Sequence, residues 1–269
     1  MKKVAIALLN AKGGVGKTTA AINIASMAAA TGKKVLICDL DPQMNATQQL
    51  GFDNIEPSRT LAEVTYESEL EPLIIHDVAK IPGLDLLPSH YQLAYLDEGI
   101  LQTGTWLRRK LATFRARYDL IFFDCSVHLG LMTRNALAAS NGILIPTQAE
   151  KHSVMGLPHL LARSRRVFEE TEVVSPWAYI LINMIRLSDL NDREWHDRIR
   201  EQYGGAVLKS MVRNNTDLKK SATGGMPIVV FDNRCSGYED FLNVTQELIN
   251  ALDEDSPHLR VVGSRAANE

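Results

Sequence analysis

The chain has 269 residues, of which 45% are hydrophobic and 23% are charged, as expected for a globular protein with a large apolar core. Its net charge of −3 excludes a protein that coats nucleic acid through bulk positive charge, so any DNA binding must come from a local basic patch. The widely spaced Cys38, Cys125 and Cys235 indicate neither a disulfide framework nor a zinc site, and they fit a reducing cytosol.

The first predicted elements are a strand, a glycine-rich loop and a helix. Val4–Leu9 is an uninterrupted apolar run, which is typical of a parallel strand covered on both faces. Residues 10–16 form the loop, and the Ala-rich segment Lys17–Ala30 predicts a buried helix. Val35–Cys38 predicts a second strand. Strand, helix and strand at this spacing indicate a βαβ unit and therefore a parallel sheet.

The remaining segments continue this alternation. Further strands are predicted at Leu84–Leu87, Leu120–Phe123, Gly142–Pro146, Ala178–Asn183, Val207–Val212 and Ile228–Phe231. Helices are predicted at Gly99–Phe114 and Gly237–Leu252, the second with a clear apolar stripe. We therefore expect one doubly wound α/β domain with a mostly parallel sheet over residues 1–252. Residues 253–269 contain Pro257 and Gly263 and predict a mobile tail.

The loop after the first strand has the residue types of a phosphate-binding loop. It reads Gly13-Gly14-Val15-Gly16-Lys17-Thr18-Thr19. Glycines let backbone N–H groups approach phosphate oxygens, and the positive end of the following helix attracts the same charge. In this setting Lys17 would contact the β- and γ-phosphates of ATP, Thr18 would hold Mg²⁺, and Thr19 would reach the α-phosphate. The alternative is a glycine-rich turn that binds no ligand.

One position of this loop departs from the general motif. Ala11 stands where the pattern G-x-x-x-x-G-K-[ST] requires a glycine, and an additional lysine, Lys12, precedes the glycines. With Lys12 included, the segment 12–19 resembles the deviant Walker A motif of the ParA/MinD group of P-loop ATPases. The resemblance implies that Lys12 acts catalytically in trans, on the ATP of a partner subunit, so that ATP is buried between two copies. The alternative for Lys12 is a solvated loop residue.

Acidic residues end two of the predicted strands. Residues 39–47 read Asp-Leu-Asp-Pro-Gln-Met-Asn-Ala-Thr and resemble switch I of ParA proteins, except that Met44 stands where the family usually has glycine. The resemblance implies that Asp41 positions or activates the attacking water and that Asp39 supports the metal region. Asp124 follows Leu120–Phe123 as a Walker B residue would, and its carboxylate would bind Mg²⁺ through water. The alternative for Asp39 and Asp41 is a solvated turn.

Residues 125–130 and Asn183 also align with positions of the ParA family. Residues 125–130 read Cys-Ser-Val-His-Leu-Gly, where ParA proteins normally read Cys-Pro-Pro-Ser-Leu-Gly. Both prolines are missing and His128 replaces the serine, which puts the rigidity of switch II and the rate of hydrolysis in question. Asn183 matches an asparagine that recognises the adenine base in the family. Its alternative role is to cap the preceding strand.

A basic patch on the C-terminal part of the chain is implied by the same resemblance. In length the chain resembles the ParA proteins that bind DNA without sequence preference. Contacts between basic side chains and DNA phosphates are sensitive to salt. The candidate residues are Arg186, Arg193, Arg213, Lys219, Lys220 and Arg234. Basic and acidic residues alternate in Leu187–Glu201, which is also typical of a solvated helix face.

The resemblance as a whole implies a cytoplasmic, nucleoid-associated ATPase that needs ATP and Mg²⁺. It would form an ATP-sandwich homodimer, bind DNA non-specifically and segregate or position a cargo. The cargo would be a plasmid, a chromosome origin or a protein body such as a carboxysome. A ParB-like or cargo-adaptor protein would stimulate hydrolysis, which would be slow without that partner and DNA.

Three alternatives remain open. A membrane-positioning ATPase like MinD would need a C-terminal amphipathic helix, whereas residues 253–257 are acidic and interrupted by proline, so we expect no membrane partner. A small-molecule ATP-dependent enzyme of the same superfamily would share the phosphate loop. An electron-transfer relative such as the nitrogenase iron protein would need two cysteines per subunit at the dimer axis, and Cys125 alone does not match.

Overall fold

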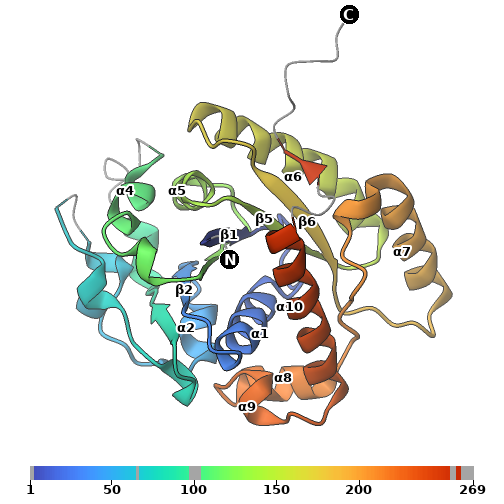
Figure 1. Cartoon of the computed structure of the whole chain (residues 1–269), viewed down its shortest axis with the longest axis horizontal. Coiled ribbons are helices and arrows are strands. Elements are labelled where there is room, and N and C mark those ends of the chain that lie inside the picture. Colours follow the sequence, from blue (N-terminus) through green and yellow to red (C-terminus); the bar gives the residue numbers. More distant parts are fainter. Residues whose placement is uncertain (1–2, 65–66, 97–103, 255–258, 262–269) are drawn as a thin grey trace, which may run out of the picture.

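The chain folds into three layers, with a β-sheet between two layers of helices (Figure 1). The computed structural model describes residues 3–64, 67–96, 104–254 and 259–261. Within these residues the sheet has the strand order β3-β2-β4-β1-β5-β6-β7, and all neighbours are parallel except β6 and β7. The strands are β1 Val4–Leu8, β2 Val35–Leu40, β3 Leu84–Leu87, β4 Leu120–Cys125, β5 Gly142–Thr147, β6 Trp177–Ile182 and β7 Leu259–Arg260.

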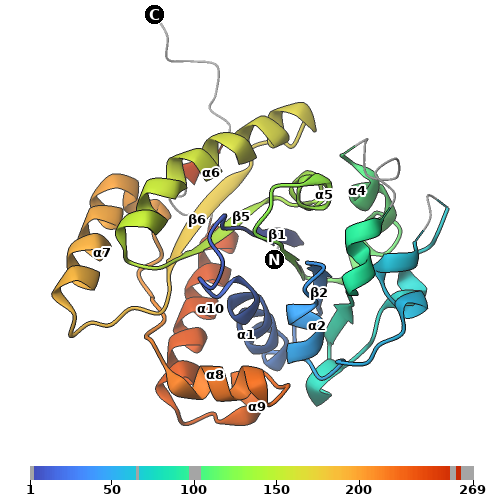
Figure 2. The ribbon, with the colours of Figure 1, turned by 180° about the vertical axis from the view of Figure 1, so that it is seen from behind.

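Helices cover both faces of this sheet, as the views from the front and from behind show (Figures 1 and 2). The helices of one layer are α1 Lys17–Ala30, α2 Asn45–Gln49, α8 Thr216–Thr223, α9 Ile228–Phe231 and α10 Ser236–Glu254. Those of the other layer are α4 Trp106–Leu111, α5 Leu131–Ala139, α6 Lys151–Glu170 and α7 Leu190–Tyr203. The predicted doubly wound, mostly parallel α/β fold is confirmed.

Alternating side chains of the buried strands build the two cores. Along β1, Ala5 and Ala7 belong to the core under α4, α5 and α6, whereas Ile6 and Leu8 belong to the core under α1 and α10. All five residues of β1 are buried, because helices lie over both of its faces. This explains why the sequence of the strand is an unbroken apolar run.

Two predicted strands have a different structure. Ile228–Phe231 is the short helix α9, which begins after Pro227 and whose first N–H group donates to the Asn23 side chain over 2.8 Å. Proline at this point favours the start of a helix because its φ angle is already helical. Val207–Val212 runs beside β6 through one isolated bridge, Val207 to Ile180, and through the N–H groups of Leu208 and Val212, and it does not form a named strand. Of the predicted helix Gly99–Phe114, only Trp106–Leu111 is helical as α4, residues 112–114 form a turn, and residues 97–103 lie outside the described residues.

The end of the chain also differs from the prediction of a mobile tail. Leu259–Arg260 pairs with Trp177 and Ala178 at the start of β6 in antiparallel orientation. The N–H group of the buried Val261 donates to the carbonyl of Pro176 over 3.0 Å. These three residues therefore extend the edge of the sheet, while 255–258 and 262–269 lie outside the described residues.

The sheet order brings three loops to one place. β4 lies between β2 and β1, and the register sets Asp39 opposite Asp124 and Asp124 opposite Leu8. Because these strands are parallel, the loops after all three leave the same edge of the sheet side by side. Ligand sites of open α/β sheets lie at this carboxyl edge.

Candidate nucleotide-binding site

A cavity of about 970 Å³ opens at this carboxyl edge. It is lined by the phosphate loop, by Asp41 and Pro42 after β2, and by residues 126–128 after β4. Small-molecule sites in proteins have volumes of about 300–1,000 Å³, so the cavity is large enough for a nucleotide. Three segments that are far apart in the sequence thus meet around one space.

Gly16 shapes the phosphate loop at the start of α1. Its φ angle is 83°, and a Cβ atom placed there would lie 2.3 Å from Nδ2 of Asn183, so no other residue fits. The same Asn183 amide donates to the carbonyl of Val15 over 2.7 Å, and its Oδ1 accepts from the N–H of Met184. Asn183 is buried, and in this structure it supports the phosphate loop. A contact with adenine would require its amide to leave Val15.

Lys17 is held inside the site. The residue is buried, and its Nζ lies 3.3 Å from the carbonyl oxygen of Asn10. Burial lowers the pKa of Lys17, while the nearby carboxylates of Asp124 and Asp41 act in the opposite direction. A phosphate group at this position would supply the anionic partner that a buried ammonium group needs.

Asp124 has the features expected of a carboxylate that binds a cation. Both of its oxygens are buried, and neither has a hydrogen-bond partner among the described residues. Burial raises the pKa of Asp124 to about 8, the Asp39 carboxylate adds to the rise, and the neighbouring Thr18 hydroxyl and Lys17 ammonium partly offset it. Unpaired buried carboxylates are rare because they are costly, so this one fits a Mg²⁺ ion bound together with Thr18.

No group of three or more His, Cys, Asp and Glu side chains among the described residues could hold a metal by itself. This agrees with the usual mode of Mg²⁺ binding at nucleotide sites. There the ion takes one or two protein ligands and completes its shell with phosphate oxygens and water.

Asp39 lies beside Asp124 in the sheet and is bound by the loop that follows β2. Its side chain accepts hydrogen bonds from the N–H and the hydroxyl of Thr47 over 2.8 and 2.7 Å, and from the N–H of Asp41 over 3.2 Å. Burial raises the pKa of Asp39 to about 6, and these hydrogen bonds oppose the rise. Asp39 thus fixes the loop after β2 and the start of α2, and its carboxylate is already engaged.

Asp41 lies at the surface of the cavity. It is half-buried, its Oδ1 accepts from the N–H of Gln43 over 3.0 Å, and its carbonyl accepts from the Ser89 hydroxyl over 2.8 Å. Met44 follows with a φ angle of 57°, in the left-handed region that favours glycine. The glycine usual in ParA proteins at this position therefore has a conformational reason.

The loop after β4 is held by hydrogen bonds in place of the two missing prolines. The Ser126 hydroxyl and the backbone of His128 lie 3.2 Å apart, and the Thr133 hydroxyl donates to the His128 carbonyl over 2.8 Å. Val127 lies close to Gly13 of the phosphate loop. His128 is exposed at the cavity. Burial raises the pKa of the Cys125 thiol, which is a core residue.

Lys12 is held by two residues that the sequence argument did not assign to the site. Its Nζ donates to Oε1 of Gln148 over 2.7 Å and forms an ion pair with Oε1 of Glu150 at 2.6 Å. The hydrogen bond of 2.8 Å from Asn10 to the Pro146 carbonyl joins the same two loops. Gln148 and Glu150 lie 136 and 138 positions from Lys12 in the chain, so the order of residues did not reveal this contact.

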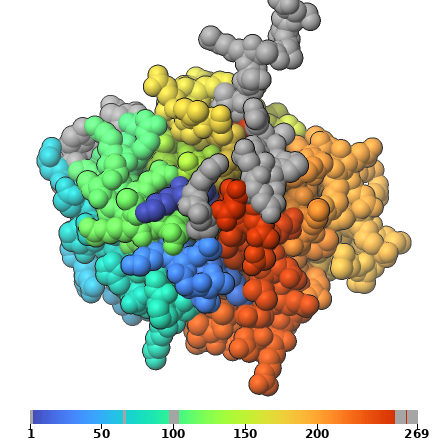
Figure 3. All heavy atoms as spheres, viewed as in Figure 1, coloured from blue at the N-terminus to red at the C-terminus, as the bar shows by residue number. Residues whose placement is uncertain are grey.

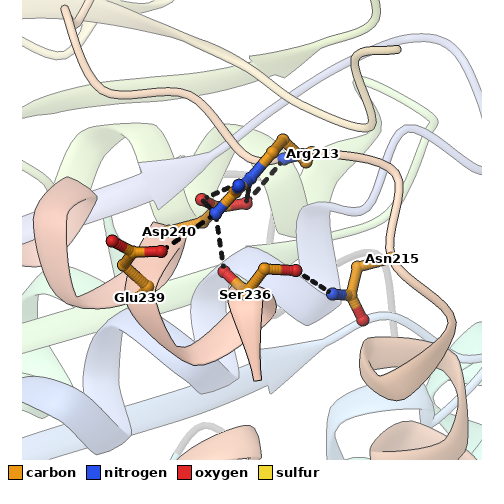
Figure 4. Close-up of polar contacts among 5 residues, drawn as sticks. All are labelled: Arg213, Asn215, Ser236, Glu239 and Asp240. Atoms are coloured by element: carbon orange, nitrogen blue, oxygen red, sulfur yellow. Dashed lines mark hydrogen bonds and ion pairs between the residues drawn. The ribbon is translucent and has the colours of Figure 1, made fainter. Parts of the chain in front are cut away.

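The candidate DNA-binding residues do not form one free basic patch. Arg213 is bound by Asp240 through several hydrogen bonds of 2.7–3.0 Å, and it also contacts Glu239 and the Ser236 carbonyl (Figure 4). Asn215 donates to the Ser236 hydroxyl beside this cluster. Hydrogen bonds to a buried charge contribute about 1.5–3 kcal/mol, and Asp240 is buried, so Arg213 serves the attachment of α10.

The other five candidates fall into two groups. Arg186 pairs with Asp189 and Asp192, and Lys220 pairs with Asp217. The exposed side chains that pair with no carboxylate among the described residues are those of Arg193, Lys219 and Arg234. Half of the candidate patch is therefore neutralised by acidic neighbours, a feature that the sequence order alone did not reveal.

The described part of the chain was compared with what a membrane-spanning helix requires. No helix there is both long and apolar enough to span a bilayer.

Comparisons with known proteins agree with this site. The family model described as "AAA domain" matches residues 2–174. The sporulation initiation inhibitor protein Soj of Bacillus subtilis is 31% identical over 246 residues, which cover 90% of this chain and 97% of Soj.

Two solved structures are similar over nearly the whole chain. One is cobyrinic acid a,c-diamide synthase from Mycobacterium smegmatis with bound ADP and magnesium, with a TM-score of 0.79, 23% identity and coverage of 96% and 99% of the two chains. The other is a putative plasmid partition protein from Borrelia burgdorferi bound to AMPPNP, with a TM-score of 0.77, 23% identity and coverage of 93% and 99%. At this level of identity the likeness concerns the fold.

Proposed function

The chain belongs to the ParA/Soj-type partition ATPases of the AAA-domain family, and we propose that it dimerises around ATP, binds DNA without sequence preference in that state and positions a cargo. Membership of this family supports ATP hydrolysis in general. The dimer, the DNA and the cargo belong to the proposal. The cargo would be a plasmid, a chromosome origin or a protein body, and a ParB-like or adaptor protein would stimulate hydrolysis.

The phosphate loop and its neighbours would hold the substrate. Backbone N–H groups of residues 13–19 and the Lys17 ammonium would bind the phosphates of ATP. Thr18 and Asp124 would hold Mg²⁺, which when bound neutralises negative charge on the phosphates. Asp41, at the cavity surface, would orient the attacking water and accept its proton. Asp39 would keep Asp41 in place through the hydrogen bond from the Asp41 N–H.

The direction of the Lys12 side chain is the observation that supports the proposed ATP-bound dimer. Lys12 directly precedes the glycines that line the nucleotide cavity, yet its Nζ donates to Gln148 and Glu150, and the residue is not part of the cavity wall. A lysine that served its own subunit's phosphates would point into that cavity. Its position at the edge of the loop supports a role on the nucleotide of a facing copy.

DNA binding in different nucleotide states tests the proposed function. The protein would be titrated into random-sequence duplex at fixed low salt without nucleotide, with ADP and with a non-hydrolysable ATP analogue. We expect a mobility shift with the ATP analogue and none in the other two states, because the dimer doubles the number of phosphate contacts. Absence of a shift in all three states, with the dimer confirmed, would contradict DNA binding.

A further inference from the structure

A basic cleft opens between α5 and α6, on the face of the sheet opposite α1 and α10. Its volume is about 380 Å³, and Arg134, Arg163 and Arg166 converge on it together with a single acidic residue, Glu170. Arg134 comes from the first turn of α5, whereas Arg163 and Arg166 lie on successive turns of α6. The order of residues does not predict that these three arginines lie close together, because β5 separates the two helices in the chain.

The charges in this cleft are not balanced. Glu170 bonds Nη1 of Arg134 over 2.5 Å and Nε of Arg166 over 2.7 Å, so one carboxylate is shared by two guanidinium groups. Arg163 is exposed and pairs with no carboxylate among the described residues. Each guanidinium has five N–H donors, most of which remain available here. The cleft therefore carries excess positive charge and donors arranged for an oxyanion.

The surface around the cleft is also basic. No acidic residue occurs in α6 between Lys151 and Phe168. Arg108 of α4 reaches the end of α6, where its guanidinium donates to the Thr171 carbonyl over 2.9 Å. Both ribbon views place α4, α5 and α6 along one side of the molecule, and the space-filling view shows the surfaces of these helices adjoining (Figures 1, 2 and 3). In the cleft, Arg134 and Arg166 share the one carboxylate of Glu170, whereas among the C-terminal candidates Arg186 and Arg213 each pair with two carboxylates and Lys220 pairs with one.

The cleft is connected to the nucleotide cavity through α5. Gly130, the residue before α5, lines both spaces, and Thr133 of the same first turn lines the nucleotide cavity and holds the His128 carbonyl. Arg134 is the next residue. Movement of the loop after β4 on nucleotide binding would therefore move Arg134 relative to Arg163 and Arg166, which stand on α6.

We propose that the cleft formed by Arg134, Arg163 and Arg166 binds phosphates of the DNA backbone and is the nucleotide-responsive part of the DNA-binding surface. This inference rests on the proposed function and names the surface that performs it. Phosphodiesters match forked guanidinium donors, and such contacts carry no sequence information. A lipid surface fits less well, because a membrane-binding face needs bulky apolar side chains beside its cations. Among the described residues of α4, α5 and α6, Met155 is the exposed large apolar residue, and it lies two turns of α6 away from Arg163.

The test compares two double variants of the full chain with the parent, all bound to a non-hydrolysable ATP analogue. Arg163→Ala/Arg166→Ala removes the cleft arginines that stand on α6, and Arg193→Ala/Lys219→Ala removes two of the three unpaired cations among the C-terminal candidates. Affinity for random-sequence duplex is measured across a salt series. For the first variant, the slope of log K against log salt should become shallower by about two for each subunit that contacts the DNA, and so by about four for the dimer, because each lost phosphate contact changes it by about 0.9.

Nucleotide affinity and dimer mass are measured for both double variants as controls for folding. Both quantities should equal those of the parent. An unchanged affinity and slope in the Arg163→Ala/Arg166→Ala variant would overturn the inference and leave DNA binding in place. If the parent itself does not bind DNA, the proposed function fails as well. Binding of anionic phosphatidylserine vesicles, but not of DNA, through these arginines would also contradict the assignment to DNA.

Discussion

Replacing Lys12 with alanine should give a protein that binds ATP but stays monomeric. The Lys17 side chain and the backbone N–H groups that would hold the nucleotide remain, so nucleotide affinity should change little. What is lost is the charge proposed to act on the partner's phosphates, and two facing nucleotides would repel each other without it. Sedimentation with a non-hydrolysable ATP analogue gives the mass, and a fluorescent nucleotide gives the affinity.

Two variants sharpen this experiment. Lys219→Ala removes an exposed lysine of α8 that pairs with no carboxylate among the described residues, and it should dimerise as the parent does. Glu150→Gln weakens the contact that holds Lys12 in its own subunit. Partly exposed ion pairs contribute about 0.2–1 kcal/mol, so this variant should dimerise at protein concentrations up to about five-fold lower. ATP-dependent dimers of the Lys12→Ala protein would refute the role of Lys12 across the interface.

Replacing Asp41 with alanine should abolish most ATP hydrolysis while leaving ATP-bound dimers intact. A positioned general base contributes about 10²–10⁴-fold to a rate, and the loss should lie in this range. The loop should keep its shape, because Ser89 bonds the backbone carbonyl of residue 41 and Asp39 bonds its N–H, and alanine retains both groups. Phosphate release in single-turnover conditions gives the rate.

The lifetime of the dimer gives a second measure of the same variant. Blocked hydrolysis should lengthen the lifetime of dimers formed with ATP, whereas dimers formed with the analogue should be unaffected. Lys17→Ala is a suitable contrast, because it should lose nucleotide binding altogether. An Asp41→Ala protein that hydrolyses ATP at the parental rate would remove Asp41 from the mechanism.

The fold was predictable where burial leaves a simple pattern. Parallel strands covered on both faces are unbroken apolar runs, so β1, β2 and β4 can be recognised without knowledge of their neighbours. The same rule misassigned Ile228–Phe231, since a short apolar run also suits one turn of helix, and here only Ile228 is buried while Val230 and Phe231 are exposed. Leu259–Arg260 could not be predicted because its pairing depends on the free edge of β6.

The sequence indicated those parts of the candidate site that lie within one segment, but not the contacts between distant segments. The order of residues in the phosphate loop placed Lys17 and Thr18 at the cavity, and the end of β2 placed Asp41 there. Asp124 is buried next to Thr18 and Lys17 and does not line the cavity. Contacts between distant segments were not visible. The carboxylate that holds Lys12 is 138 positions away, and Asp240, which neutralises Arg213, is 27 positions away. A sequence shows that a charge exists, whereas only the fold shows whether it is paired.

The mass of the protein in each nucleotide state tests the central claim most directly. Sedimentation equilibrium would be run on the parent protein without nucleotide, with ADP, and with a non-hydrolysable ATP analogue and Mg²⁺. We expect the monomer mass of 29.9 kDa in the first two conditions and twice that mass with the ATP analogue. A monomer in all three conditions, with the analogue shown to be bound, would contradict it.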